Sequence, residues 1–182
     1  MKPLRRGALR APLLIGVLLI ALSVSRCGTD SDDDPTEQQG PVRAQVTDVV
    51  DGDTIEVELA DGTQEDVRYI GIDTPETVKP DAPVECGGPR AHHLNERLVS
   101  GRTVTLRFDA ERRDVYGRLL AYVYLPPSEP RGRRLFVNAE LVKRGVARTL
   151  TIPPNDSFAE LLARLAARAG ARGLGIWGRC PL

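Results

Sequence analysis

The stretch VRYIGIDTPE, residues 67–76, decides the fold of this chain. Its apolar positions predict a buried strand, and Pro75 predicts a turn where that strand ends. Asp73 and Glu76 stand at this end of the strand. A second acidic segment, VVDGDTIEV at residues 49–57, lies about one hairpin upstream and contains a D-G turn signal. We therefore expect two acidic loops to face one another.

The segments on either side of this stretch predict a small β-barrel with helices inserted and appended. Five short segments have the composition of strands: 43–50, 53–60, 64–72, 103–109 and 119–125. Three have the spacing of helices: about 89–100, 136–145 and 156–170. Gly145 ends the second helix, whereas the third is opened by Asp156 or Ser157 as a cap and closed by Gly170. We expect an α+β fold, mainly a five-stranded Greek-key barrel of the OB type with three helices.

The N-terminal region has the pattern of an export signal. A basic start precedes an uncharged apolar run at residues 11–25, which is short for a membrane span but suits a signal peptide. Cys27 follows where a bacterial lipoprotein has its lipidated cysteine, although Arg26 departs from the small residue expected there. We expect a lipoprotein-like signal at 1–27, a disordered acidic tether at 28–40 and one domain at 41–182. The protein is then exported and either anchored to the membrane by lipid or secreted.

The chain has three cysteines, and an exported location permits a disulfide. If Cys27 carries lipid, Cys86 and Cys180 remain as a pair, which would tie the loop after the acidic strand to the end of the chain. Two free thiols are the alternative. His92 and His93 are adjacent in a predicted helix and diverge too far to hold one metal ion, so we expect solvated surface side chains.

The formal net charge is zero, with 25 basic and 25 acidic residues in the whole chain. The signal region is basic and the tether is acidic, which leaves the predicted domain itself balanced. A neutral domain argues against broad, non-specific coating of nucleic acid but permits a local basic site.

Four motifs together resemble one family. DGDTI, VRYIGIDTPE, DVYGR and NAELVKRGVAR occur in the order and with the approximate spacings of the staphylococcal nuclease (thermonuclease) family, over residues 42–178. The resemblance implies a calcium-dependent endonuclease, a monomer, that hydrolyses DNA and RNA and leaves 3′-phosphate ends. It also implies an OB-type barrel.

The residue types at the motif positions fit this chemistry. Asp53 and Asp73 supply the hard oxygen ligands that calcium prefers, and the Thr74 carbonyl could add a neutral one. The resemblance carries these three over as the metal site and Glu76 as the base that activates water.

Two planar, permanently charged arginines could grip a phosphate and stabilise the charge of the transition state. The resemblance assigns this role to Arg68 and Arg118, and it assigns Tyr116 to the terminal phosphate of the substrate. Simpler roles compete with these assignments. Asp51 and Asp53 could be turn residues, which we expect of Asp51, and Arg68 could form a surface ion pair with Glu65 or another acid.

Two features depart from the family pattern. Val115 stands where the best-known members have a lysine, and ARTLTIPPND at residues 147–156 has no aromatic residue where those members have tyrosines. We expect weaker substrate binding rather than lost catalysis, because neither change removes a proposed ligand, base or arginine. The rival hypothesis is an OB-type module that binds nucleic acid or a protein without cleaving anything. The presence of Glu76 and both arginines favours the enzyme.

Overall fold

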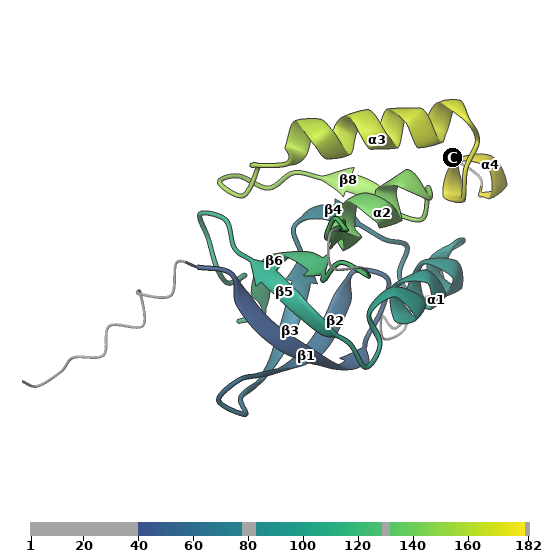
Figure 1. Cartoon of the computed structure of the whole chain (residues 1–182). Helices are drawn as coiled ribbons and strands as arrows, with labels where there is room; N and C mark the ends of the chain where they lie inside the picture. Colours follow the sequence, from purple (N-terminus) through teal and green to yellow (C-terminus); the bar gives the residue numbers. More distant parts are fainter. Residues whose placement is uncertain (1–39, 78–82, 129–131, 181–182) are drawn as a thin grey trace, which may run out of the picture. The chain divides into compact units, whose positions relative to one another are not determined.

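The computed structural model describes residues 40–77, 83–128 and 132–180. The proposed signal segment, Cys27 and nearly all of the proposed tether lie outside these ranges. Within them the chain forms a β-barrel, with one helix beside it and a group of helices at one end (Figure 1).

Five strands form a closed, mixed barrel with the order β3-β2-β1-β5-β6, which the parallel pairing of β3 with β6 completes. A two-residue strand, β7, pairs with the last two residues of β6. This closed architecture matches the predicted OB-type barrel. The barrel strands and β7 have these bounds: β1 Val42–Val49, β2 Thr54–Leu59, β3 Gln64–Tyr69, β5 Thr103–Arg107, β6 Leu119–Leu125 and β7 Leu135–Phe136.

Alternation along each strand explains why these segments form a barrel. In β1, Ala44, Val46 and Val49 are buried, and the residues between them are exposed or half-buried. β2 and β3 bury Ile55, Val57 and Val67. Burial of one face against the opposite wall removes these side chains from water and stabilises the closed sheet.

The predicted strand 64–72 is two strands rather than one. β3 ends at Tyr69, and β4, Gly71–Asp73, leaves the barrel to pair with β8, Arg148–Leu150. Gly71 permits the change of direction because its φ is 81°, in a region that favours glycine. A Cβ at this position would also lie 2.6 Å from Leu162 Cδ1. The turn therefore carries Asp73 away from the barrel wall.

The three predicted helices are present, with a fourth short one. Their bounds are α1 Gly88–Val99, α2 Val137–Lys143, α3 Ala159–Ala171 and α4 Ile176–Arg179. Gly145 follows α2 with φ 71°, as expected. The predicted cap of α3 is wrong: Phe158 precedes the helix and makes no side-chain cap. Ser157 instead donates its N–H and hydroxyl to Asp109, so a tertiary contact displaces the local one. Gly170 lies inside α3.

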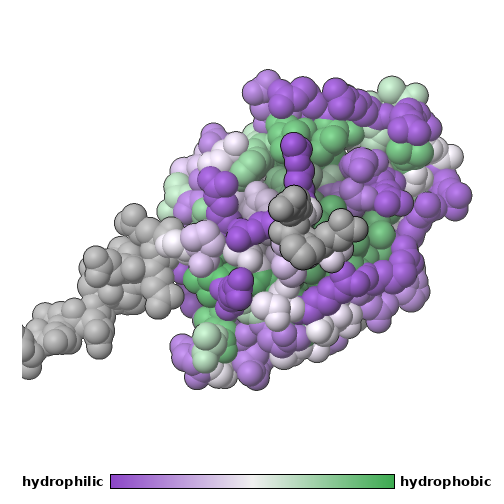
Figure 2. All heavy atoms as spheres, in the orientation of Figure 1, coloured by the Kyte–Doolittle hydropathy of each residue, from purple (hydrophilic) through white to green (hydrophobic). Residues whose placement is uncertain are grey.

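Cys86 and Cys180 form a disulfide, the pairing expected if Cys27 carries lipid. The bond joins the segment before α1 to the chain after α4, two segments 94 residues apart. Figure 2 shows hydrophilic side chains over much of one face of the molecule, with hydrophobic areas between them. In the described ranges, no helix is both long and apolar enough to span a membrane.

Candidate functional site

The loop between β1 and β2 presents the first acidic group of the site. Asp51 is a turn residue, as predicted, because its Oδ1 accepts the N–H of Asp53 at 3.0 Å. The glycine of the D-G pair is needed for close packing: a Cβ on Gly52 would lie 2.7 Å from both Thr74 Oγ1 and Ala91 Cβ. The loop is thus pressed against the loop that follows β4.

Asp53 is buried and held by the second acidic loop. Only 3% of the residue is exposed to solvent. Oδ2 accepts the backbone N–H of Thr74 at 2.7 Å and the Thr74 hydroxyl at 3.0 Å. The two acidic loops therefore face one another, as the sequence predicts.

Arg68 joins the carboxylates of the two loops. Its Nη1 forms an ion pair with Asp53 Oδ1, and its Nη2 donates to Asp73 Oδ1 at 3.0 Å. Because one guanidinium contacts both carboxylates, one oxygen of Asp53 and one oxygen of Asp73 lie close to each other. Glu65, the competing partner from the sequence, binds Arg113 at 2.7 Å instead.

The burial of Asp53 has an electrostatic consequence. Burial raises the pKa of Asp53 to about 6, which the positive charge of Arg68 and the Thr74 hydrogen bond only partly oppose. Asp51 adds to the rise. The charged form of a buried carboxylate is stabilised by a nearby cation, and in the structure that cation is the Arg68 guanidinium.

Buried asparagines hold these loops in place, and the sequence analysis missed them. Asn95 of α1 donates to the Asp51 carbonyl at 3.0 Å and accepts from the hydroxyl of Tyr69, also at 3.0 Å. Asn138 of α2 donates to the Ile70 carbonyl at 2.9 Å, at the point where β3 ends. A buried amide must satisfy its donors and acceptors, which fixes the backbone it contacts. The only signal in the sequence was an Asn at an apolar-face position of each helix.

The loop before β6 presents Arg118 and Tyr116. Asp114 Oδ2 accepts from Arg118 Nε at 2.8 Å and pairs with its Nη2 at 2.7 Å. The guanidinium lies 5.4 Å from the centre of the Tyr116 ring. Tyr116 and Val115 are 81% and 93% exposed, so neither packs against the barrel. Asp114, which the sequence analysis did not select, orients the arginine.

Arg68 and Arg118 line one cavity of about 550 Å³, named here the Arg68–Arg118 pocket. Its walls come from β3, β4, the loop before β6 and the segment around β8, and they include Leu150 and Ile152 where aromatic residues are absent. Tyr116 and Val115 stand at the same cavity. The structure thus brings the two arginines together although they are 50 positions apart in the sequence.

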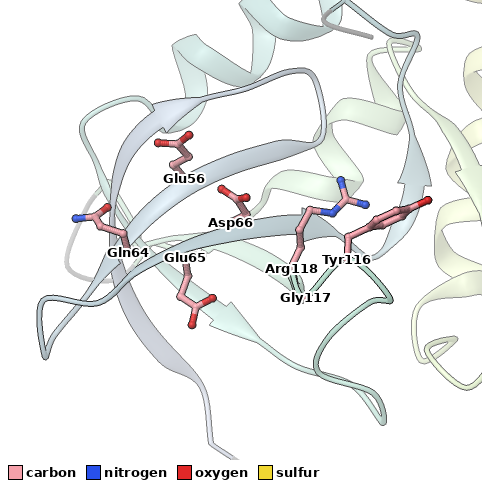
Figure 3. A pocket seen from close by; sticks show the side chains of 7 residues that line it. All are labelled: Glu56, Gln64, Glu65, Asp66, Tyr116, Gly117 and Arg118. Atoms are coloured by element: carbon pink, nitrogen blue, oxygen red, sulfur yellow. The ribbon is translucent and has the colours of Figure 1, made fainter. Parts of the chain in front are cut away.

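A second cavity, of about 420 Å³, shares Arg118 and Tyr116 with this pocket (Figure 3). The carboxylates of Glu56, Glu65 and Asp66 line it, and Arg118 and Tyr116 lie side by side at one end. Of these acids, Glu65 is paired with Arg113, and Glu56 and Asp66 make this cavity less favourable for a phosphate than the Arg68–Arg118 pocket.

Glu76 follows β4 after Pro75 and is half-buried. Its backbone is anchored to the segment beside the disulfide, because the N–H of Glu85 donates to the Glu76 carbonyl at 3.0 Å. The Glu85 carboxylate in turn accepts the Glu76 N–H at 3.4 Å. Glu76 does not line the Arg68–Arg118 pocket among the residues described.

The donor set fits a hard divalent cation. No group of three or more His, Cys, Asp or Glu side chains is arranged to hold a metal ion in the described ranges. Asp53 and Asp73 nevertheless offer two carboxylates that already share a cationic partner, and Thr74 adjoins both. Oxygen ligands of this kind suit calcium or magnesium, and few protein ligands leave room for water and substrate. The predicted surface role of the histidines is correct for His93, which is exposed and pairs with Glu96, whereas His92 is half-buried.

Comparisons with known proteins give a consistent result. A family model described as "Staphylococcal nuclease homologue" matches residues 66–179. The chain is 43% identical over 131 residues to a protein named "Thermonuclease" from Staphylococcus intermedius, covering 72% of this chain and 73% of the relative. It is 40% identical over 129 residues to "Thermonuclease" from Staphylococcus hyicus, covering 71% and 72%. The "SPbeta prophage-derived endonuclease YokF" of Bacillus subtilis (strain 168) is 39% identical over 132 residues, covering 71% of this chain and 42% of that protein.

Proposed function

This chain belongs to the staphylococcal nuclease family and is a hydrolase that cleaves phosphodiester bonds in nucleic acid, and we propose that it is a calcium-dependent endonuclease acting on DNA and RNA. We propose further that cleavage leaves 3′-phosphate ends. The observation that carries the calcium-dependent assignment is the contact of one guanidinium, Arg68, with both Asp53 and Asp73 beside a cavity that also contains Arg118.

Asp53 and Asp73 are the proposed calcium ligands, together with the Thr74 carbonyl. Their hard oxygens match calcium's preference, and the raised pKa of Asp53 makes a cation partner favourable. Bound calcium would lower the pKa of water and neutralise charge on a phosphate oxygen. Thr74 keeps Asp53 in place through two hydrogen bonds to one carboxylate oxygen.

Glu76 is the proposed general base. It lies three residues past Asp73, at the end of a Pro-fixed turn, and is anchored through its backbone to Glu85. Its role is to orient a water molecule and take its proton.

Arg68 and Arg118 are proposed to hold the phosphate from two sides. Asp114 binds Arg118 through Nε and Nη2, so Nη1 is not used by this contact. Fixed donors of this kind stabilise the charge that builds on a phosphate in the transition state. Tyr116 would donate its exposed hydroxyl to the terminal phosphate. Phosphate contacts carry no sequence information, so we expect weak base preference.

The decisive experiment is plasmid degradation by the purified domain in calcium, in magnesium and in chelator. We expect cleavage in calcium, less in magnesium because magnesium demands tighter octahedral geometry, and none in chelator. Glu76→Gln is a matched control that keeps the size of the side chain and removes the base. Full activity in excess chelator contradicts the metal assignment. Binding of nucleic acid without cleavage under every condition supports the rival module.

The cellular location rests on the sequence alone. We propose that residues 1–27 direct export, that Cys27 carries lipid, that residues 28–40 tether the domain, and that the domain acts as a monomer. Cys27→Ser should move the protein from the membrane fraction to the soluble exported fraction. An unchanged distribution contradicts the lipid anchor but not the nuclease.

A further inference from the structure

The outer face of the barrel carries arginine and aromatic side chains on four neighbouring strands. Strand register places Arg43, Thr105, Tyr124 and Phe136 next to one another on β1, β5, β6 and β7. Directly opposite residues of antiparallel strands point to the same side of the sheet, and Arg107 lies on this side because it is two positions from Thr105. The arginine–aromatic face consists of Arg43, Arg107, Tyr124 and Phe136, together with the exposed Arg134 two positions before Phe136 in the chain.

The aromatic part of this face is pre-arranged. The rings of Tyr124 and Phe136 are stacked, with centroids 4.7 Å apart and 15° between their planes, and both residues are half-buried. Arg107 lies 5.4 Å above the ring of Phe158. It also lies beside the Tyr124 hydroxyl: burial raises the pKa of Tyr124, and Arg107 partly offsets that rise. The side chains therefore need little ordering to receive a ligand.

The arginine part of this face is exposed and positive. Arg43, Arg107 and Arg134 are exposed, and none forms a salt bridge with an acid in the part of the chain that the structure describes. The nearest acid at the α3 end, Asp109, is engaged by Tyr122 and Ser157. Asp156 is exposed beside it. Three cations thus remain available to an anionic ligand.

The opposite side of the barrel is acidic. Glu56 and Asp66 are direct cross-strand partners on β2 and β3, and both are exposed. Glu58 occupies the next outward position of β2 and accepts a hydrogen bond from Gln64. A polyanion that leaves the Arg68–Arg118 pocket is repelled by this side and attracted by the arginine–aromatic face.

β6 runs between the two positive regions, and its outward residue Tyr122 is buried beneath Phe158, so a ligand that reaches both regions passes around this cover. Arg118 immediately precedes β6, and Tyr124 lies six positions further along it on the same side of the strand. At about 3.4 Å per residue this separation is roughly 20 Å. A ligand must therefore be several nucleotides long to reach from one region to the other, which fits the site sizes of about 4–16 nucleotides found for single-stranded ligands of OB folds.

We propose that the arginine–aromatic face is a second binding surface for single-stranded nucleic acid, outside the pocket where cleavage occurs. Arginines contact successive phosphates, and the exposed edge of the Tyr124–Phe136 pair meets the face of an unpaired base in an edge-to-face contact. The single-stranded form is favoured because a duplex keeps its bases stacked within itself. The inference rests on the proposed nuclease function only in that the bound strand is also the substrate.

The test is a variant with Arg43→Gln, Arg107→Gln and Arg134→Gln together. Binding of a fluorescent oligothymidylate of about 16 nucleotides is measured by anisotropy, in chelator, over a range of salt concentrations. We expect affinity to fall by on the order of tenfold, and the slope of log affinity against log salt to lose about 2 units, since each phosphate contact in a single strand contributes about 0.7. Cleavage of an oligothymidylate of about 4 nucleotides should be unchanged, because it cannot reach the face.

The matched control removes the same charge elsewhere. Arg164→Gln, Arg168→Gln and Arg172→Gln change three exposed arginines of α3 or its end, and we expect little change in salt slope. A further variant, Tyr124→Leu, removes the aromatic edge but no charge. It should weaken binding of the longer oligonucleotide several-fold without altering the salt slope.

The outcomes separate this inference from the proposed function. Unchanged binding of the longer oligonucleotide in the Arg43, Arg107 and Arg134 variant overturns it, as does an equal loss in the α3 control. Equal loss of cleavage of both oligonucleotides, with a lowered melting temperature, also overturns it, because the arginines then only support the fold. If the unaltered protein cleaves nothing, the nuclease proposal fails while the anisotropy measurements still decide the binding surface.

Discussion

The two arginines of the Arg68–Arg118 pocket lie in different surroundings. On the Arg68 side, the arginine pairs with Asp53, which is 3% exposed, is not part of the pocket lining, lies at the start of a barrel strand and is also held by Thr74. On the other, Tyr116 is 81% exposed and stands on a loop, and Arg118 is held by one carboxylate of the same loop. A buried charge that loses one of its partners is strongly destabilised, whereas the interactions of exposed charges are weakened by water and salt. We therefore expect substitutions to have large effects on the first side and graded effects on the second.

The largest effect should come from the Arg68 side, where the Asp53 side chain is buried and the Asp73 side chain is 49% exposed. Asp53→Ala or Asp73→Ala should abolish calcium-dependent cleavage, because each removes one charged ligand from a site with few protein ligands. Cleavage rates are measured over a calcium titration, with melting temperature as the control for folding. Near-normal rates at saturating calcium in a folded Asp73→Ala protein would show that this carboxylate is not a ligand.

A smaller but still large effect is expected for Arg118→Lys. Turnover should fall by more than about a hundredfold, because a point charge cannot reproduce the planar fork in the transition state. The kinetic constants kcat and KM are measured separately on one oligonucleotide. If only KM rises, Arg118 binds substrate and does not stabilise the transition state.

Asp114→Asn tests whether Asp114 positions Arg118, which lies in the same loop. The amide keeps the shape of Asp114 but loses the charge that pairs with Arg118. We expect kcat to fall by roughly fivefold, since a partly exposed pair of this kind contributes on the order of 1 kcal/mol. Asp61→Asn, in an exposed turn between β2 and β3, is the matched control. An equal change in both variants would indicate a general charge effect rather than positioning of Arg118.

The disulfide should affect stability more than chemistry. It closes a sequence separation of 94 residues, for which chain entropy gives at most about 4–5 kcal/mol. The reduced domain should melt several degrees lower and still cleave at low temperature, because neither cysteine belongs to the proposed metal or arginine groups. Glu85 links the bridge to the Glu76 backbone, so a loss of a few-fold in kcat is expected as well.

Cys86→Ser with Cys180→Ser, together, should reproduce the reduced protein. Mass spectrometry of a non-reduced digest should show the two cysteine peptides joined. Two cysteines free to alkylate in protein exported by its host would contradict the bridge, and would weaken the use of cysteine pairing to select Cys27 for lipid.

The sequence predicted the barrel because the signals of its strands and turns are local, whereas the roles of the selected site residues stay predictions. Strand alternation and the D-G turns set β1, β2 and β3, and the motifs selected Asp53, Asp73, Arg68 and Arg118. The end of β3 before Gly71 was not predicted, because the apolar run continues through this glycine. The turn depends on close packing against Leu162, which is distant in the sequence. The cap of α3 failed for the same reason, since Asp109 of a distant loop takes the Ser157 donors.

Contacts that depend on three-dimensional neighbours could not be predicted in this way. Nothing in the spacing of Asn95 and Asn138 indicates which carbonyl each amide will contact. Arg68 had nearer acids in Glu65 and Asp66, yet it pairs with Asp53 and Asp73, because the strand register sets Arg68 opposite Thr54, the residue after Asp53. Burial, rather than sequence distance, decides which ion pair forms.

The smallest expected effect is a gain on the exposed side. Val115 is 93% exposed beside the Arg68–Arg118 pocket, so Val115→Lys adds a cation without removing any packing. An exposed charge contributes at most about 1 kcal/mol, which corresponds to a KM lower by about fivefold at low salt. The value of kcat should not change, because the lysine would contact the substrate equally in the ground and transition states. Val84→Lys, at another exposed valine, is the control. If KM is lowered equally at high salt, or equally in the control, the lysine does not act through a screened contact with the substrate's phosphate. The small effects expected of exposed substitutions beside Arg118 would then need another cause.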